Sequence, residues 1–351
     1  DQDVRTQIHG DALWDGEAFW ITWNQANEEG KFEVWAGRYD CALIPLVDPF
    51  AVSQIPEMND VDPSIARSGD VIMIVWARDS SFAGGEMYNL STPSMRFDRL
   101  SGTPLGEERA QLARTLNDQG ALDPLVGNQW MPKLVALPDG GFILSGAWGS
   151  PERNSFMVYI QTISAEGDPI GEAHLADEGG RDQNNPQLKI SPNHVLDMIG
   201  RGTNESGAEG VWLKSWLTTP LSETPVGANA WQTSPLQNLT SNGWLSASSG
   251  ERDEMDEAAA LGSRPPLIGA DEDGVSTLFA SDRPPVQVSA AGLFSLAPQL
   301  NHGLITYYER LSGYRNKIWW HERSSTGDLS PARLIEQTGP AAPYQLALAP
   351  L

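Results

Sequence analysis

The stretch DPSIARSGDVIMIVWARD, from Asp62 to Asp79, consists of two mostly apolar segments joined by a Gly-Asp turn. Gly and Asp tolerate the positive φ angles that tight hairpin turns require, so this pattern predicts a β-hairpin. The first segment opens with Asp-Pro, and the second ends in Trp-Ala-Arg-Asp. These flanking residues give the hairpin a signature that can be searched for elsewhere in the chain.

The hairpin signature recurs along the chain, and a period of about 40 to 55 residues is typical of propellers. The other copies are DALWDGEAFWITW from Asp11, MPKLVALPDGGFILSGAW from Met131, NPQLKISPNHVLDMIGRG from Asn185, RPPLIGADEDGVSTLFASDR from Arg264 and APQLNHGLITYYER from Ala297. A further strand, a turn such as SGTPLG from Ser101 or EGDPIG from Glu166, and a short fourth strand follow most copies. Each unit is therefore expected to contain four strands.

Four-stranded antiparallel units bury their faces by stacking, and closing the stack into a ring removes most free edges. The sequence therefore predicts an all-β fold, a β-propeller of four-stranded blades. The visible copies favour six blades, with five or seven as alternatives. Because Gly and Pro are spread evenly, we expect one domain over residues 1–351. The stretch from Asn238 to Leu261 fits no strand of the repeat, so a non-repeat insertion is expected at about 238–261.

Charge and hydropathy limit the classes of partner. The chain has 23 Lys and Arg against 46 Asp and Glu, a net charge of −23, which disfavours nucleic acid and anionic membranes. No run approaches the roughly 18 apolar residues of a membrane-spanning segment. The chain begins with Asp1, which is typical of a mature protein after removal of a signal sequence, so a secreted, periplasmic or cell-surface location is expected. The single Cys41 can form no internal disulfide.

In a four-stranded blade, the loops from strand two to strand three and the connections between blades emerge on one face around the central opening. We call this the funnel face. The side chains expected to bind a ligand there are Arg78, Asp79, Gln129, Trp130, Arg201, Arg283 and Arg310. The arginines could bind carboxylate, sulfate or phosphate groups bidentately, or each could be neutralised by an acid beside it. Trp130 precedes a predicted innermost strand and could stack on a ligand.

Acidic residues of the funnel face are the candidates for catalysis. Glycoside hydrolysis needs one carboxyl group as acid and a second as base or nucleophile. The candidates, which could converge from different blades, are Asp62, Asp182, Asp282 and Glu309. The histidines show no metal-ligand spacing, and no Gly-x-Ser-x-Gly nucleophile motif occurs, so no metal site is expected.

Calcium is the one cofactor that the acidic segments leave open. DEDG, from Asp271 to Gly274, and ERDEMDE, from Glu251 to Glu257, could supply oxygen ligands. A hairpin turn explains the first segment as well, and a solvated helical face explains the second.

The unit resembles the repeats of secreted or surface-anchored bacterial propeller proteins, most closely in WDGEAFWITW (Trp14–Trp23) and LPDGGFILSGAW (Leu137–Trp148). That resemblance implies the fold and export. DPSIARSGDVIMIVW, from Asp62, also looks like the blade-opening pattern of propeller glycoside hydrolases, in which an Asp before Pro can be the catalytic base. By this likeness Asp62 is the candidate base. The arginines invite comparison with sialidases, although no Ser-x-Asp-x-Gly-x-Thr-Trp box is present.

Two functions follow from these observations. The first is a binding or interaction module that presents its funnel face to a glycan or a protein partner. The alternative is a carbohydrate-active enzyme, a glycoside hydrolase or polysaccharide lyase, that uses funnel-face acids with Arg as substrate clamps. Propellers carry many functions, so the fold alone does not choose between the two.

Overall fold

The structure is a computed structural model, and nearly all of its described residues beyond the turns lie in β-strands. The described residues are 7–79, 90–110, 112–116, 122–125, 127–149, 156–176, 181–190, 194–203, 209–218, 230–232, 244–247, 267–270, 276–280, 283–287, 295–301, 304–310, 316–322 and 330–337. Among them, no helix occurs that could span a membrane.

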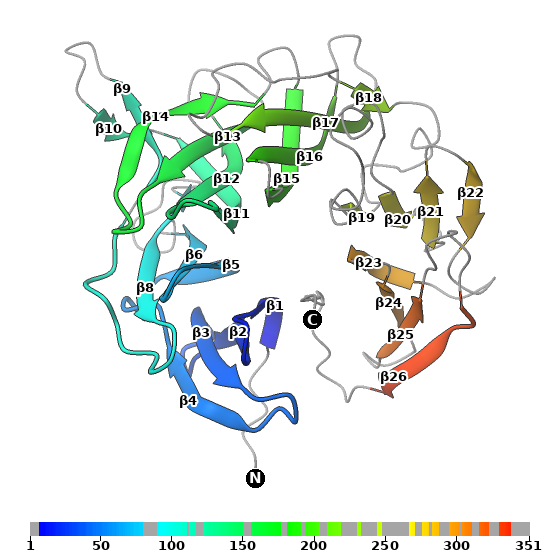
Figure 1. Ribbon diagram of the computed structural model, residues 1–351, viewed down its shortest axis with the longest axis horizontal. Helices are drawn as coiled ribbons and strands as arrows, with labels where there is room; N and C mark the ends of the chain where they lie inside the picture. Colours follow the sequence, from blue (N-terminus) through cyan, green and yellow to red (C-terminus); the bar gives the residue numbers. More distant parts are fainter. Residues whose placement is uncertain are drawn as a thin grey trace.

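The described strands form six four-stranded antiparallel sheets, arranged as a ring around a central opening (Figure 1). The first three blades contain β1 (Gln7–Trp14), β2 (Phe19–Ala26), β3 (Phe32–Tyr39) and β4 (Pro45–Ala51), then β5 (Asn59–Ser68), β6 (Val71–Asp79), β7 (Leu90–Ser91) and β8 (Ser94–Asp98), then β11 (Asn128–Ala136), β12 (Phe142–Gly149), β13 (Phe156–Ile163) and β14 (Pro169–Leu175). A two-stranded sheet, β9 (Arg114–Leu116) with β10 (Leu122–Pro124), lies between blades two and three in the sequence.

The other three blades are built in the same way. They contain β15 (Arg181–Ile190), β16 (Val195–Thr203), β17 (Glu209–Leu217) and β18 (Ala230–Gln232), then β19 (Trp244–Ala247), β20 (Leu267–Ala270), β21 (Ser276–Ala280) and β22 (Arg283–Gln287), then β23 (Ser295–Asn301), β24 (Leu304–Arg310), β25 (Asn316–Glu322) and β26 (Arg333–Gln337). The first strand of each blade lies nearest the central opening (Figure 1). The predicted propeller of four-stranded blades is confirmed.

In the fifth blade, the repeat copy forms other strands than the sequence predicted. Its innermost strand β19 falls within the stretch 238–261, which the sequence pattern assigned to no strand. The copy that begins at Arg264 therefore supplies the second and third strands, β20 and β21, instead of the first and second. The sequence of β19, WLSA, contains no Pro, in contrast to β5, β11, β15 and β23.

In the described part of the structure the core lies between neighbouring blades, with buried apolar clusters between blades one and two, two and three, and three and four. In β6, Ile72, Ile74 and Trp76 pack toward blade one, whereas Met73 and Val75 pack toward blade three. Successive side chains of a strand point to opposite faces, so a strand covered on both sides needs apolar residues at every position. This explains the unbroken run in the stretch that predicted the fold. Burying each such side chain contributes about 1.5–3 kcal/mol to the stability of the folded protein.

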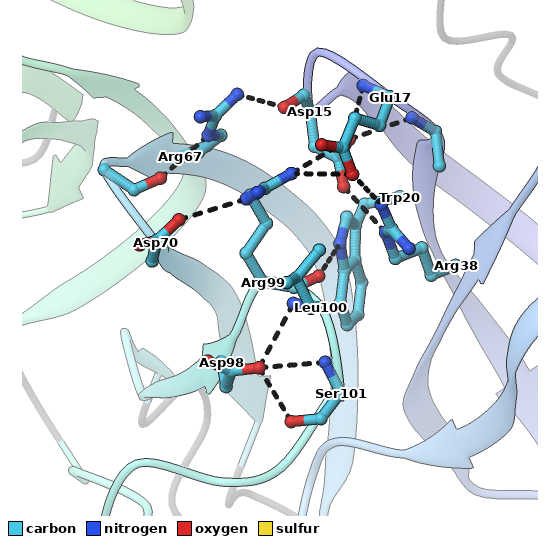
Figure 2. A network of polar contacts seen from close by, with 12 residues as sticks. Asp15, Glu17, Trp20, Arg38, Arg67, Asp70, Asp98, Arg99, Leu100 and Ser101 are labelled. Carbon is cyan, nitrogen blue, oxygen red and sulfur yellow. Dashed lines mark hydrogen bonds and ion pairs between the residues drawn. The ribbon is translucent and has the colours of Figure 1, made fainter.

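On the face opposite the funnel face, a network of polar contacts ties blade one to blade two (Figure 2). The carboxylate of Asp15, in the β1–β2 turn, accepts a hydrogen bond from Nε of Arg38 at 2.7 Å. Nη1 of Arg99, which follows β8, lies 3.7 Å from the same carboxylate and 3.4 Å from that of Glu17. Nε1 of Trp20 donates to the carbonyl oxygen of Arg99 at 3.1 Å. Two chain segments far apart in sequence are therefore joined at this seam.

The innermost strands of blades one to three are also linked by side-chain hydrogen bonds. The hydroxyl of Ser64 in β5 donates to Oδ2 of Asp11 in β1 at 3.0 Å. The backbone N–H of Leu134 in β11 donates to the same hydroxyl at 3.1 Å. These contacts fix the relative height of the three strands, and so the positions of the residues around the central opening.

Candidate functional site

Four innermost strands bulge at a residue followed by Pro. At each of these positions two residues of the innermost strand oppose one residue of the second strand. The bulged pairs are Asp62-Pro63 in β5, Met131-Pro132 in β11, Asn185-Pro186 in β15 and Ala297-Pro298 in β23. A bulge interrupts the ladder, which accommodates the missing N–H of Pro, and it redirects the adjacent side chain. The Pro of the sequence repeat therefore marks a repeated kink near the funnel face.

Two of the residues before these prolines have left-handed backbones. Asp62 has a φ of 54° and Met131 a φ of 50°. Such conformations are uncommon for residues other than Gly and cost about 1–3 kcal/mol each. They occur preferentially where the surrounding structure holds a side chain in position for binding or catalysis. Asp62, the sequence candidate for a catalytic base, is one of the two.

Asp62 is joined to the neighbouring blade through Trp130. Nε1 of Trp130, in β11, donates a hydrogen bond to Oδ2 of Asp62 at 2.9 Å. Trp130 remains 39% exposed, and its ring meets that of Phe156 in a T-shaped contact with centroids 6.5 Å apart. An aromatic ring and a carboxylate, both accessible and both near the central opening, are groups that can bind a sugar. The structure thus brings together two residues that the sequence had singled out separately.

Arg78 is engaged in the protein interior. Its Nε and Nη2 donate to the two carboxylate oxygens of Asp60 at 2.8 and 2.7 Å, and its Nη1 and Nη2 donate to Glu108. Arg78 is 5% exposed, and its guanidinium lies 5.7 Å from the ring centroid of Trp76. Of the two interpretations of the sequence, neutralisation by acids holds at this arginine. Glu108 was not anticipated, because it lies beyond β8 and outside every repeat motif.

The two acids and Arg78 form a buried triad whose ionisation is set by opposing effects. Burial raises the pKa of Asp60, and the hydrogen bonds from Arg78 oppose that rise without cancelling it. Burial alone would lower the pKa of Arg78, but the hydrogen bonds that Arg78 donates to Asp60 and Glu108 outweigh it and raise the pKa. The triad holds the funnel-face ends of β5 and β6 together, two residues before Asp62 in β5.

The arginines of different blades do not occupy equivalent positions. In each second strand one residue lies opposite the bulge, and the arginine follows it at a different distance. Arg201 is one residue beyond that point, Arg78 is two residues beyond it, and Arg310 is three residues beyond it. A shift of one residue moves a side chain to the other face of a sheet, so no common orientation follows from the repeat. Arg283 opens β22 and pairs with Ala280 at the β21–β22 hairpin, on the opposite face from the funnel face. Arg283 was expected on the funnel face, and its position at this hairpin corrects that expectation.

The remaining sequence candidates have varied environments. Gln129 is fully buried, and its Nε2 donates to the carbonyl oxygen of Leu125 at 2.8 Å while its Oε1 has no partner. Asp79 is partly exposed at the end of β6. Asp182 lies at the funnel-face end of β15, and Glu309 lies in β24 opposite Ser295. The candidate side chains outside the described part of the structure are those of Asp182, Arg201, Arg283, Glu309 and Arg310.

Three further predictions fall on residues that the structure does not describe. These are the candidate acid Asp282 and the possible calcium segments 251–257 and 271–274. Within the described residues, no group of three or more His, Cys, Asp or Glu side chains could hold a metal ion.

No protein-family model matches the chain, and no curated protein matches it. Solved structures do. The Trypanosoma rangeli sialidase in complex with the inhibitor DANA has a TM-score of 0.55 at 9% identity, with 94% of this chain and 54% of that chain covered. The Hadza microbial sialidase Hz136 has a TM-score of 0.52 at 11% identity, with 87% and 63% covered. A polysaccharide lyase, ulvan lyase, has a TM-score of 0.52 at 9% identity, with 95% and 84% covered.

At these identities the similarity defines a class of fold, the β-propeller. This chain spans about 54% to 63% of the length of the sialidases that it matches. The comparisons therefore support the architecture alone.

Proposed function

We propose that this protein is a carbohydrate-active β-propeller that cleaves a glycan, as a glycoside hydrolase or polysaccharide lyase, at a centre containing Asp62. One observation carries the proposal. A carboxylate with a left-handed backbone is held at the innermost strand of one blade by an accessible indole from the next.

The chemistry of this pair fits bond cleavage in a sugar. A hydrogen bond from an indole N–H favours the ionised form of a carboxylate. An ionised Asp62 can act as a general base or nucleophile in hydrolysis, or remove a proton in elimination. Hydrolysis needs a second carboxyl group, for which we propose Asp182 and Glu309, whose strands end on the same face.

The named activities of the similar structures agree with this proposal. Two are sialidases and one is a polysaccharide lyase, and all have folds similar to this chain. A glycan is accordingly the partner that we propose, in preference to a protein. Polymeric glycans occur mainly outside the cytoplasm, which agrees with a secreted, periplasmic or surface location.

The proposal is tested by incubating the purified protein with neutral glycans (arabinan, xylan) and acidic glycans (ulvan, sialylated oligosaccharides). New reducing ends report hydrolysis, and ultraviolet absorbance of an unsaturated uronate reports elimination. We expect turnover of at least one glycan and a loss of at least a hundredfold in Asp62→Asn, in line with the removal of a general base. Asp48→Asn, on the exposed strand β4, serves as the control.

A non-catalytic glycan-binding module is the second candidate, because Trp130 is accessible for stacking. Binding of a glycan without turnover, and without any effect of Asp62→Asn, would favour that candidate over the enzyme. An unchanged thermal unfolding midpoint for Asp62→Asn establishes that lost turnover does not reflect lost structure.

A further inference from the structure

We propose that Trp130 is the positioning residue of this centre, with two separable roles. Its N–H orients the Asp62 carboxylate, and its ring is the platform on which a sugar ring lies. The inference rests on the proposed function and adds the group that links binding to chemistry. It also makes the centre a unit of two blades, since neither blade two nor blade three contains both residues.

The orientation of Asp62 depends on two bulges. Asp62 is the bulged residue of β5, and Trp130 immediately precedes the bulged residue of β11. Both bulges include a left-handed residue, at Asp62 and at Met131. The 2.9 Å hydrogen bond between Nε1 of Trp130 and Oδ2 of Asp62 therefore joins two segments whose backbones are already fixed. A carboxylate held in this way reaches its reactive geometry without further ordering.

The platform role follows from the exposure of the ring. Nε1 of Trp130 is engaged in the hydrogen bond to Asp62, and its ring meets that of Phe156 in a T-shaped contact. With both contacts in place, 39% of the residue stays exposed. Trp is well suited to present an apolar surface and a polar N–H at the same time. A sugar ring lying on this surface would be next to the carboxylate. The ligand class that fits is thus a carbohydrate with one apolar ring face.

Two substitutions separate the roles. Trp130→Phe keeps an aromatic surface and removes the N–H, so kcat is expected to fall about tenfold while KM changes less than about twofold. Trp130→Ala removes both, so KM is expected to rise about tenfold in addition, the size of effect that a lost aromatic contact produces. Trp35→Phe is the matched control, because Nε1 of Trp35 also donates to a carboxylate, that of Glu33, at 3.4 Å. The control should leave kcat and KM unchanged.

A measurement that needs no substrate completes the test. The free energies of unfolding of Trp130→Phe, Asp62→Asn and the double variant form a cycle in which coupled residues are not additive. Coupling together with the split between kcat and KM supports the inference. Turnover without coupling, or a Trp130→Phe enzyme with wild-type kcat, overturns the positioning role alone. Coupling without turnover of any glycan overturns the proposed function, and with it the role of Trp130 in catalysis.

Discussion

In the four blades whose innermost strand contains a bulged Pro, the residue before that Pro has a different identity but the same place in the fold. Asp62 is acidic, Met131 apolar, Asn185 an amide and Ala297 small. The repeat therefore preserves the kink and varies the side chain that the kink presents. The recurring Pro could be recognised in the sequence. The bulge could not, because it depends on the register between two paired strands, and the pattern of one strand does not contain that register.

Met131 allows the strain of this position to be measured apart from the chemistry. We expect Met131→Gly to raise the free energy of unfolding by up to about 1.5 kcal/mol. Relief of a left-handed backbone is worth about 1–2 kcal/mol, and the extra freedom of Gly in the unfolded chain offsets about 0.5–1 kcal/mol of that. Urea unfolding followed by circular dichroism measures the change.

Ala136→Gly is the control on the same strand, because Ala136 is not among the residues with positive φ. There Gly should lower the free energy of unfolding by about 0.5–1 kcal/mol. If both variants lose stability equally, the conformation of Met131 carries no strain.

At the scale of the element, ion pairs in this fold are expected to contribute very differently to the free energy of unfolding. The Arg78 triad is buried, whereas Arg109 and Asp168 pair on the exposed side of the ring, with side chains 36% and 62% accessible. We expect Arg78→Met to lower the free energy of unfolding by about 3–5 kcal/mol, because two carboxylates lose their cation in the interior. Arg109→Met should cost less than about 1 kcal/mol. Chemical denaturation of both variants makes the comparison, and equal losses would contradict it.

The Asp15 network gives the blade seam a dependence on pH. Burial would raise the pKa of Asp15, but hydrogen bonds from Arg38 and from the N–H groups of Glu17 and Ala18 lower it overall. A carboxyl group whose pKa is depressed on folding stabilises the protein above its unfolded pKa, about 3.9, and loses this contribution as the pH falls further. We therefore expect Asp15→Asn to cost about 1.5–3 kcal/mol at neutral pH, the range for a hydrogen bond to a charged group.

That cost should shrink as the pH falls below about 4, where Asp15 itself becomes protonated in the wild type. Urea unfolding at several pH values measures it. Glu17→Gln is the control, since the side chain of Glu17 is 63% exposed and its contacts are long. A constant difference between Asp15→Asn and the wild type at all pH values would show that the charge of Asp15 is not the cause.

Elements with a strong local signal could be predicted from sequence, and those without one could not. The hairpins around Asp-Gly and Gly-Asp turns were found because the turn residues themselves require the conformation. β19 was missed because its four residues carry neither a turn nor an alternating pattern. Glu108 was missed for a different reason. Its contact with Arg78 spans 30 residues and depends on how the outer part of blade two folds back.

At the scale of the whole molecule, the surface charge opposes folding. At a net charge of −23 the surface carboxylates repel one another. Salt screens this repulsion between charges that are farther apart than about 8–10 Å. The buried pairs are screened much less. We therefore expect the thermal unfolding midpoint to rise by a few degrees when sodium chloride is increased from about 0.01 to 0.2 M. At about pH 5, where fewer carboxylates are ionised, the rise should be smaller, and a fall in the midpoint at neutral pH would contradict the prediction.

The sequence alone could select the two residues of the proposed centre as candidates but not the contact between them. The repeat located the funnel face, and Asp62 and Trp130 were both among the candidates. Their hydrogen bond could not be predicted, because 68 residues and a blade boundary separate them. For Arg78 the sequence left ligand binding and neutralisation by an acid open. The acids that neutralise it, Asp60 and Glu108, come from its own blade.

Every described four-stranded sheet consists of strands that are consecutive in the sequence, and the first strand lies nearest the central opening. During synthesis, a chain of this kind can complete the hydrogen bonds of one blade before the next has left the ribosome. Contacts that close early and locally are fast to form, and they limit the time for which strand edges stay open to other chains. The seam contacts between Asp15 and Arg99, and between Asp62 and Trp130, then add each new blade to a finished one, so the candidate centre is first assembled when blade three docks.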